Sequence, residues 1–296
     1  MNSLNKSSSN LELTYILADM RPQDQPSFIK LTATVRGEHQ ISEEEYTLSQ
    51  IYRFFRGNRA DYQKSLDAVL ANIAWRRTAP FKEAIELDLG QFDYVYQFVK
   101  MGFYGLDSQG RPIRVIRPPS LDPQILAERY DEQTRFLYGL QNIERIQNII
   151  FPLCSRKAGR YIEGMISIVD IKEVNTAKII GNIKLLNSVK ANSKVFQEHY
   201  PEMAHRAIII NAGFMFTGLW NIVKLFLNRL TLEKFVIFGS NYMGELLKHT
   251  TRENLPVAIG GTCTEDINSF PNFFDQEMSA SVAEKRLKLK FSPFLA

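Results

Sequence analysis

Three short and almost uninterrupted apolar runs constrain the fold of this chain more than any other feature. They cover residues 165–169, 207–210 and 235–238, and each is bounded by polar residues or glycine. A half-exposed strand alternates apolar and polar residues, so runs this short and this uniform indicate strands buried on both faces. Longer stretches with helical spacing, 175–200 and 214–228, separate the runs. Strands that alternate with helices predict an α/β fold with a mostly parallel sheet.

The residues before the sheet predict a separate helical unit. Ser42 followed by Glu45 is a capping-box pattern, and Gly57 can end the helix that it opens. Asp61 can cap a second helix, whose apolar residues fall on one face. Residues 41–90 are therefore expected to form a helical N-terminal domain.

The rest of the chain divides into three segments. Residues 1–40 contain Pro22 and Pro26, which break any long helix, and are expected to be flexible or irregular. Residues 91–265 carry the predicted strands and form the main α/β domain. Residues 266–296 are a C-terminal extension with a basic run, for which a solvated helix end is favoured over a membrane contact.

The segment 214–228 has an unusual distribution of apolar residues. Thr217, Asn221, Lys224 and Asn228 form one narrow polar stripe, and almost every other residue is apolar. A helix that is apolar over most of its circumference must bury two sides. The pattern fits an interior helix packed between sheet and neighbours. It equally fits a helix with one face lining a lipid cavity and the other facing a membrane.

Charge and cysteine content narrow the class of protein. The 296 residues carry a formal net charge of +4, which predicts no nucleic-acid partner and suits transient contact with an anionic membrane surface. Two cysteines do not make a disulfide framework, no signal-sequence pattern opens the chain, and no run reaches the ~20 apolar residues of a spanning helix. We expect a cytoplasmic protein associated peripherally with membranes, at the Golgi, endosomes or another organelle.

Sequence motifs for catalysis and metal binding are missing from the chain. It contains no G-x-x-x-x-G-K-[ST], G-x-G-x-x-G, G-x-S-x-G or H-E-x-x-H sequence, and its four histidines have no metal-ligand spacing. We therefore expect a protein that is not an enzyme, with no metal and no cofactor.

One segment competes with this expectation. Cys154 to Arg160 satisfies C-x5-R, the phosphate loop of cysteine phosphatases. That loop needs a strand before the cysteine and a helix after the arginine. Here the helical stretch 131–151 precedes Cys154 and a strand is predicted after Arg160, so a phosphoinositide phosphatase is strongly disfavoured.

A series of motifs, in order and spacing, resembles the CRAL-TRIO lipid-binding family, in particular its fungal-type phosphatidylinositol/phosphatidylcholine transfer branch. The motifs lie in residues 51–59, 73–77, 107–112, 154–159, 168–172, 199–202, 210–213 and 253–261. The resemblance implies a helical N-terminal domain beside an α/β domain that encloses one phospholipid, with a mobile gating helix over its mouth. It implies transfer of that lipid between membranes, phosphatidylinositol being favoured, and leaves open its presentation to a lipid kinase.

The family's residues carry over to this chain one by one. Thr231 and Lys234 match a threonine and a lysine that hold the inositol phosphate, Arg59 matches a basic position, and Glu202 matches an acidic one. Ser167 keeps a hydroxyl of the phosphatidylcholine pocket. The gating helix would contribute apolar side chains from six positions: Phe214, Phe216, Trp220, Val223, Phe226 and Leu227.

The departures from the family concern the headgroups. Asn58 replaces an arginine, and Asn228-Arg229 replaces Asp-Pro. Tyrosine and serine positions of the phosphatidylcholine pocket are occupied by Arg114, Met165 and Phe196. We therefore predict that phosphatidylinositol binding is retained and that phosphatidylcholine binding is weakened or replaced by another lipid. Carriage of a retinoid-like or tocopherol-like ligand is the alternative.

Overall fold

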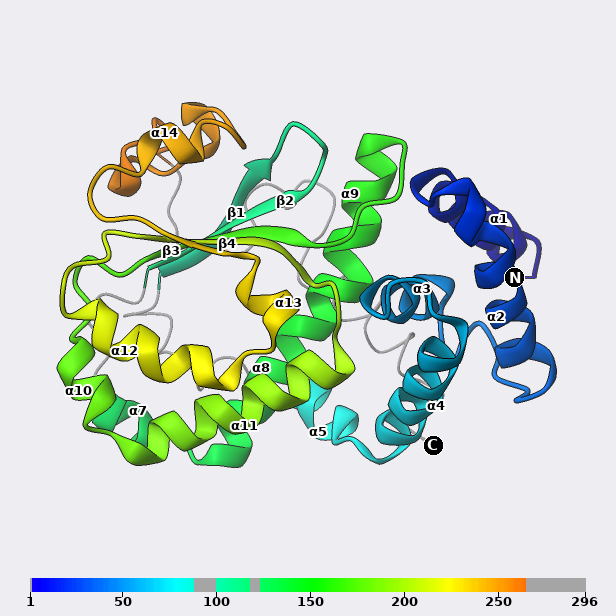
Figure 1. The fold of residues 1–296 in the computed structure, drawn as a ribbon, viewed down its shortest axis with the longest axis horizontal. Helices are drawn as coiled ribbons and strands as arrows, with labels where there is room; N and C mark the ends of the chain where they lie inside the picture. Colours follow the sequence, from blue (N-terminus) through cyan, green and yellow to red (C-terminus); the bar gives the residue numbers. More distant parts are fainter. Residues whose placement is uncertain (1, 88–99, 118–122, 265–296) are drawn as a thin grey trace.

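A helical N-terminal part lies beside an α/β part in the computed structural model, which describes residues 2–87, 100–117 and 123–264 (Figure 1). The N-terminal helices are α1 (Asn2–Asp19), η1 (Pro22–Asp24), α2 (Gln25–Gly37), α3 (Leu48–Gly57), α4 (Tyr62–Thr78) and α5 (Phe81–Glu86). Of the described helices, none is both long and apolar enough to cross a membrane.

Residues 2–37 are mostly helical, so the expectation of a flexible or irregular segment over residues 1–40 is wrong. Pro22 and Pro26 stand in the first turn of η1 and α2, where a missing backbone N–H costs nothing. Ile16 and Phe28 are fully buried in a core shared with α3 and α4. The prolines therefore start helices here, and burial of these side chains stabilises them.

The predicted cap of α4 is confirmed, whereas the predicted cap of α3 is wrong in position. Asp61 caps α4, its side chain accepting a hydrogen bond from the Lys64 amide at 3.0 Å. Ser42 does accept a bond from the Glu45 amide at 3.1 Å, but this bond closes a turn. The helix begins later, where Thr47 and Gln50 form the capping box. A capping box does open α3, as predicted, but it is formed by Thr47 and Gln50 instead of Ser42 and Glu45.

The α/β part contains a five-stranded sheet with strand order β1-β2-β3-β4-β5. Its strands are β1 (Lys100–Leu106), β2 (Pro112–Arg117), β3 (Met165–Asp170), β4 (Ala204–Ile210) and β5 (Phe235–Ile237). Only β1 is antiparallel to its neighbour, and the four others run parallel. The predicted α/β fold with a mostly parallel sheet is confirmed.

Helical segments cover the two faces of this sheet (Figure 1). The outer face packs against the C-terminal segment, which contains α14 (Met243–Leu246), η5 (Arg252–Asn254) and η6 (Val257–Ile259). The inner face lies toward the remaining helices: α7 (Pro123–Arg129), α8 (Glu132–Arg145), η3 (Ile146–Ile150), α9 (Phe151–Ala158), α10 (Thr176–Ile180), α11 (Ile183–His199), α12 (Phe216–Val223), η4 (Lys224–Phe226) and α13 (Arg229–Leu232).

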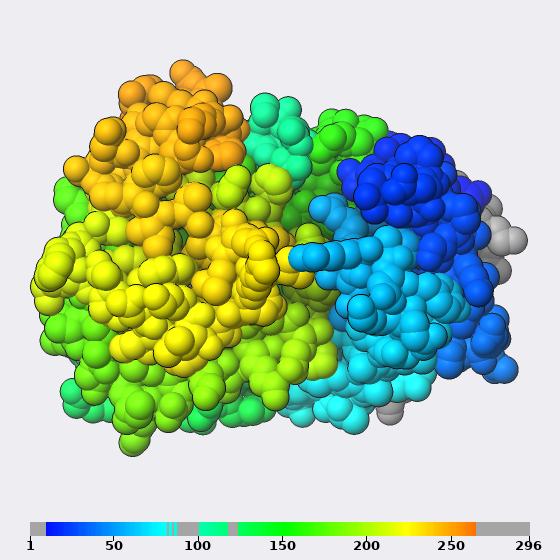
Figure 2. All heavy atoms as spheres, in the orientation of Figure 1, coloured from blue at the N-terminus to red at the C-terminus, as the bar shows by residue number. Residues whose placement is uncertain are grey.

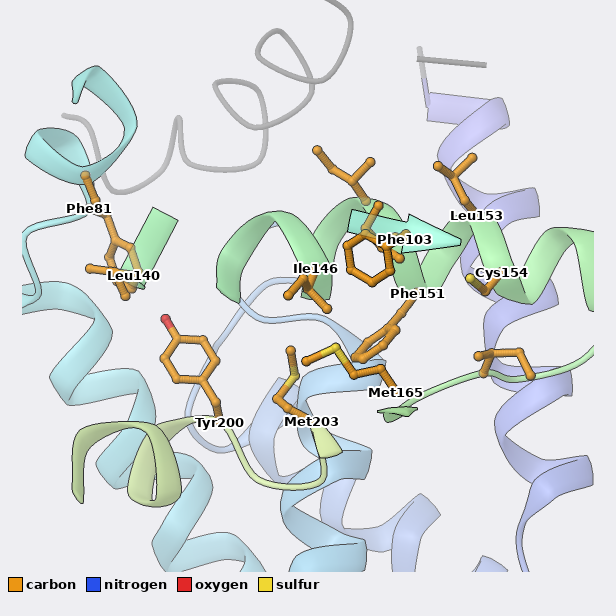
Figure 3. Packing of buried hydrophobic residues seen from close by; sticks show 14 of the residues in the cluster. Phe81, Phe103, Leu140, Ile146, Phe151, Leu153, Cys154, Met165, Tyr200 and Met203 are labelled. Atoms are coloured by element: carbon orange, nitrogen blue, oxygen red, sulfur yellow. The ribbon is translucent and has the colours of Figure 1, made fainter. Parts of the chain in front are cut away.

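Alternate side chains of β3 point to opposite faces of the sheet. Ile166 and Ile168 join the core on the outer face. Met165 belongs to the inner-face core formed with α8, η3 and α9, part of which Figure 3 shows, and Val169 belongs to another inner-face cluster under α12. The side chain between them, Ser167, is half-buried.

A buried ion pair joins the N-terminal helices to the α/β part. The guanidinium of Arg76 in α4 donates to both carboxylate oxygens of Glu144 in α8, at 2.8 and 3.3 Å, and both side chains are at most 3% exposed. Tyr200 and Asn148 donate further hydrogen bonds to Glu144. Since every lone pair of this carboxylate is engaged, the pair fixes the two parts against each other.

Candidate functional site

Charged side chains from both parts of the molecule meet where α3 ends. We define the junction cluster as Arg56, Arg59, Glu202, Arg206 and Lys234, which line one cavity of about 270 Å³. Lys234 Nζ lies 3.1 Å from Glu202 Oε1, and Arg56 Nη2 lies 3.7 Å from Glu202 Oε2. The cavity is lined by these four cations and by two carboxylates, Glu202 and Glu233, so its lining keeps a net positive charge.

Two residues of the junction cluster adopt an uncommon backbone conformation. Arg59 has φ +56° and Glu202 has φ +61°. Residues other than glycine rarely adopt positive φ, and such strain concentrates at functional sites. The strain here orients side chains from the end of α3 and from the turn before β4 toward the same cavity.

An apolar groove of about 400 Å³ continues from the junction cluster and shares Glu202 and Lys234 with it. Its predominantly apolar lining includes Phe54, Ile143, Phe196, Tyr200, Met203, Leu227 and Leu230. Thr231 also lines the groove. On the surface in Figure 2, the yellow segment that contains α13 meets the light-blue N-terminal helices. A charged mouth that leads into an apolar groove suits an amphipathic ligand.

The buried carboxylate of Glu163 forms an ion pair with Arg56. Glu163 is 7% exposed, and its Oε1 lies 2.7 Å from Arg56 Nη1. Burial raises the pKa of Glu163, against the opposing effect of Arg56. Burial also disfavours the charged form of Arg56, but the carboxylates around it outweigh that effect and raise its pKa. Arg56 therefore stays cationic at the mouth of the cavity.

The structure brings four of the five predicted ligand residues together. Arg59, Glu202 and Lys234 belong to the junction cluster, and Thr231 lines the adjoining groove. Ser167 lies away from them, on the inner face of β3, where it is the register partner of Arg114 in β2. Arg56 lies in the same motif as Arg59, residues 51–59, but the motif alone predicted no role for it.

Two other members of this site were missed at the sequence level. Arg206 belongs to β4, and its buried Nε has no hydrogen-bond partner in the described part of the chain. Glu163 precedes β3. Neither residue belongs to a motif, so only the folded chain brings them to Arg56.

The predicted gating helix is shorter than residues 214–228. It consists of α12 and η4, and Leu227 is extended, with φ −106° and ψ 136°. Asn228 ends the segment because its side chain caps α13, accepting a hydrogen bond from the Thr231 amide at 2.8 Å. The apolar spacing predicted one continuous helix, but Asn228 ends it by capping the next helix, α13.

Residues 214–227, which contain α12 and η4 and which we name the gating segment after their predicted role, bury one side only. Phe216 is 8% exposed, and the Trp220 ring lies 5.2 Å from that of Phe235 in β5. On the outer side, Phe214 is 92% exposed and Leu225 is 77% exposed. The expectation that this helix must bury two sides is therefore wrong within this structure, and apolar side chains stand at the surface.

The other predicted gating side chains fall between these extremes. Val223 belongs to the cluster under α12, and Phe226 and Leu227 are half-buried. Leu227 also lines the apolar groove. The residues of the polar stripe, Thr217, Asn221, Lys224 and Asn228, are all exposed, as their spacing predicted.

Cys154 lies inside a helix and not in a phosphate loop. It belongs to α9, is fully buried, and the helix ends at Gly159 with φ +62°. Burial raises the pKa of the Cys154 thiol to about 12. A thiol with that pKa is no nucleophile at neutral pH, and the surrounding helix offers no ring of backbone amides.

Residues 97–261 match the family model described as the CRAL/TRIO domain. The chain belongs to the CRAL/TRIO family. It is 26% identical over 281 residues to the phosphatidylinositol/phosphatidylcholine transfer protein SFH12 of Arabidopsis thaliana, covering 89% of this chain and 51% of that protein. It is 29% identical to the Sec14 cytosolic factor of Schizosaccharomyces pombe, covering 72% of this chain and 74% of that protein.

Some of these relatives are much longer than this chain. The chain spans about half of SFH12 and only 35% of the related transfer protein SFH4 of Arabidopsis thaliana. Among solved structures, the crystal structure of Sfh5 superposes with a TM-score of 0.60 at 15% identity, covering 75% of this chain and 82% of that one. At this identity the likeness shows the CRAL/TRIO fold alone.

Proposed function

We propose that this chain binds one phospholipid and transfers it between membranes, with phosphatidylinositol as the preferred ligand. The observation that carries the proposal is the junction cluster, whose four cations surround the mouth of an apolar groove. Relatives that match most of the chain are named phosphatidylinositol/phosphatidylcholine transfer proteins. The proposal extends their lipid class to this chain.

Phosphodiester binding would rest on side chains of the junction cluster and on Thr231. Arg59 forms no ion pair with any described residue, so its guanidinium is available to a phosphate. Lys234 can add a charge-assisted bond, and the Thr231 hydroxyl can add a neutral one. Glu202 would hold Lys234 and Arg56 in place and could accept a hydrogen bond from an inositol hydroxyl.

Uptake of a whole phospholipid would require the gating segment to move. A groove of about 400 Å³ is small for a diacyl lipid, and Leu227 narrows it. The exposed side chains Phe214 and Leu225 could enter a bilayer interface while the segment is displaced, which would shelter apolar surface during exchange. Motion of this segment is therefore part of the proposal.

The decisive experiment compares transfer of labelled phosphatidylinositol between vesicles by two double variants. Arg59→Ala with Lys234→Ala removes two cations from the cavity. Lys64→Ala with Lys248→Ala removes two cations that are 74% and 70% exposed elsewhere. Loss of two charge-assisted bonds predicts at least a ~10-fold lower transfer rate for the first variant. The second should transfer at the wild-type rate.

The same comparison tests the competing ligand class. If both double variants transfer phosphatidylinositol equally well, the junction cluster does not bind the headgroup, and a carrier of an uncharged hydrophobic ligand is favoured. Presentation of the lipid to a kinase is a finer part of the proposal. It predicts faster phosphorylation of vesicle phosphatidylinositol by a purified lipid kinase when wild-type chain is added, and no acceleration by the Arg59→Ala, Lys234→Ala variant.

A further inference from the structure

Arg114 projects from the middle of the sheet into the interior of the α/β part. It lies on β2, between β1 and β3, with Phe103 and Ser167 as its register partners. Its neighbours Ile113 and Val115 belong to the outer-face core. Because side chains alternate along a strand, Arg114 points to the inner face, toward α8, where Tyr138 lies nearby.

The guanidinium of Arg114 has no carboxylate partner among the described residues. Its Nη2 contacts the Met101 sulfur, and its Nε is buried without a hydrogen-bond partner in that part of the chain. Burial lowers the pKa of Arg114 to about 10, with only the nearby Tyr138 opposing this shift. An arginine that is shielded from water without a carboxylate partner destabilises the fold.

Two other arginines in the described part of the chain have carboxylate partners. Arg76 has Glu144, and Arg117, three residues after Arg114 on β2, has Asp170 at 2.9 Å. Asp170 is fully engaged, since it also accepts hydrogen bonds from the Asn211 side chain and from a backbone amide. Asp170 is therefore not available as a partner for Arg114.

The inner face next to Arg114 is incompletely covered by described side chains. Phe103 and Met165 belong to the core packed on α8 and α9 (Figure 3). Val169 belongs to a separate cluster under α12. Ser167 lies between these two clusters, and both Ser167 and Arg114 keep part of their surface accessible. Two apolar walls therefore flank a cation and a hydroxyl.

We infer that Arg114, with Ser167 beside it, binds the anionic group of a second lipid ligand, a carboxylate or a phosphomonoester. The inference rests on the proposed lipid-carrier function and names the ligand class of a subsite separate from the junction cluster. A guanidinium binds carboxylate or phosphate through two parallel N–H···O bonds. The same charge repels choline, so phosphatidylcholine is a poor ligand at this subsite.

Lipid exchange followed by native mass spectrometry tests the inference. The purified chain is incubated with phosphatidylcholine vesicles that contain phosphatidic acid, phosphatidylserine or oleate as a minor component, and the bound lipid is identified. We expect the anionic lipid to be enriched over phosphatidylcholine in the wild-type chain. Arg114→Met should reduce that enrichment by ~10-fold, because a charge-assisted bond is lost. Separate vesicles for each lipid distinguish a headgroup from a free fatty acid as the source of the anion.

Two comparisons separate this subsite from a structural role of Arg114. Arg114→Met removes an unpaired buried charge, so the ligand-free variant should unfold at the wild-type temperature or above it. Arg117→Met leaves Asp170 unpaired, so it should unfold at a lower temperature and keep the preference for anionic lipid. In the wild-type chain, phosphatidic acid should raise the unfolding temperature more than phosphatidylcholine does, a measurement that needs no variant.

The outcomes distinguish failure of this inference from failure of the proposed function. Binding of phosphatidylinositol together with equal uptake of anionic lipid and phosphatidylcholine overturns the subsite and leaves the carrier function standing. Anionic enrichment that survives Arg114→Met also overturns it. Equal loss of phosphatidylinositol in Arg114→Met would place the phosphodiester at Arg114 and contradict both assignments. A chain that takes up no lipid from any vesicle overturns the carrier function itself.

Discussion

Gln197 of α11 accepts a hydrogen bond from the backbone amide of Asn228, with 2.7 Å between the amide nitrogen and Oε1. Its Nε2 donates to the carbonyl of Phe226 at 2.9 Å. One side chain thus binds backbone groups on both sides of Leu227, where the chain leaves the helical conformation. Gln197 holds the end of the gating segment against α11.

Replacing Gln197 should loosen the gating segment. Gln197→Ala removes both hydrogen bonds, and we expect faster lipid exchange and faster amide hydrogen exchange over residues 224–230. Loss of these two bonds, of which only the one to Phe226 is partly buried, predicts ~1–2 kcal/mol lower stability. Gln63→Ala, which removes an exposed bond to Asp67, is the matched control. Unchanged exchange rates in Gln197→Ala would show that the segment opens elsewhere.

The neighbouring arginines at the end of α4 should differ sharply in their effect on stability. Arg76→Ala leaves the Glu144 carboxylate buried and unpaired, so we expect a loss of ~3–5 kcal/mol in the free energy of unfolding. Arg77 is 56% exposed and pairs with Glu45, so Arg77→Ala should cost at most ~1 kcal/mol. Denaturant titration of both variants measures the difference. Equal effects would mean that the buried pair does not join the two parts.

The two cysteines should react at different rates. Cys154 is fully buried with its pKa raised to about 12 by burial, whereas Cys263 is partly exposed. At pH 8 we expect a thiol reagent to modify one thiol per folded chain rapidly and the second only in denaturant. Cys263→Ser should abolish the rapid phase. Rapid modification of Cys154 would reopen the phosphatase interpretation.

His199 makes the junction between the two parts sensitive to acid. Its ring stacks on Trp75 with 3.9 Å between centroids, and burial, aided by the charge of Arg76, lowers its pKa from 6.5. The neutral ring is favoured in the folded state. Its contribution to stability is therefore complete above pH 6.5 and decreases as the pH falls through the lowered pKa.

Fluorescence of Trp75 can follow this titration. In a Trp220→Phe background, protonation of the stacked His199 ring should quench Trp75 with a midpoint below pH 6.5. His199→Gln should remove the transition and flatten the loss of stability between neutral and mildly acidic pH. A midpoint at or above the value of free histidine would contradict the lowered pKa.

Local patterns in the sequence were sufficient wherever structure depends on near neighbours. The apolar runs identified β3 and β4 because strands buried on both faces need no polar alternation. The third run also forms a strand, but β5 lies at the edge of the sheet and is not buried on both faces, since Ile237 is 37% exposed. Asp61 identified the start of α4 because a cap is read from adjacent residues. The resemblance to the family predicted Arg59, Glu202, Thr231 and Lys234 as ligand-binding residues. These four lie far apart in the sequence, so local patterns alone would not have grouped them.

The sequence by itself determined the fold class, the cap of α4 and the residue types of the proposed headgroup site. Only the tertiary structure decided that residues 2–37 are mostly helical, that the gating segment ends at Leu227, and that Arg114 has no carboxylate partner among the described residues. Each of these depends on contacts between residues far apart in the chain, such as Gln197 with Asn228. Propensity and spacing describe neighbours along the chain, whereas burial and pairing are properties of the folded whole.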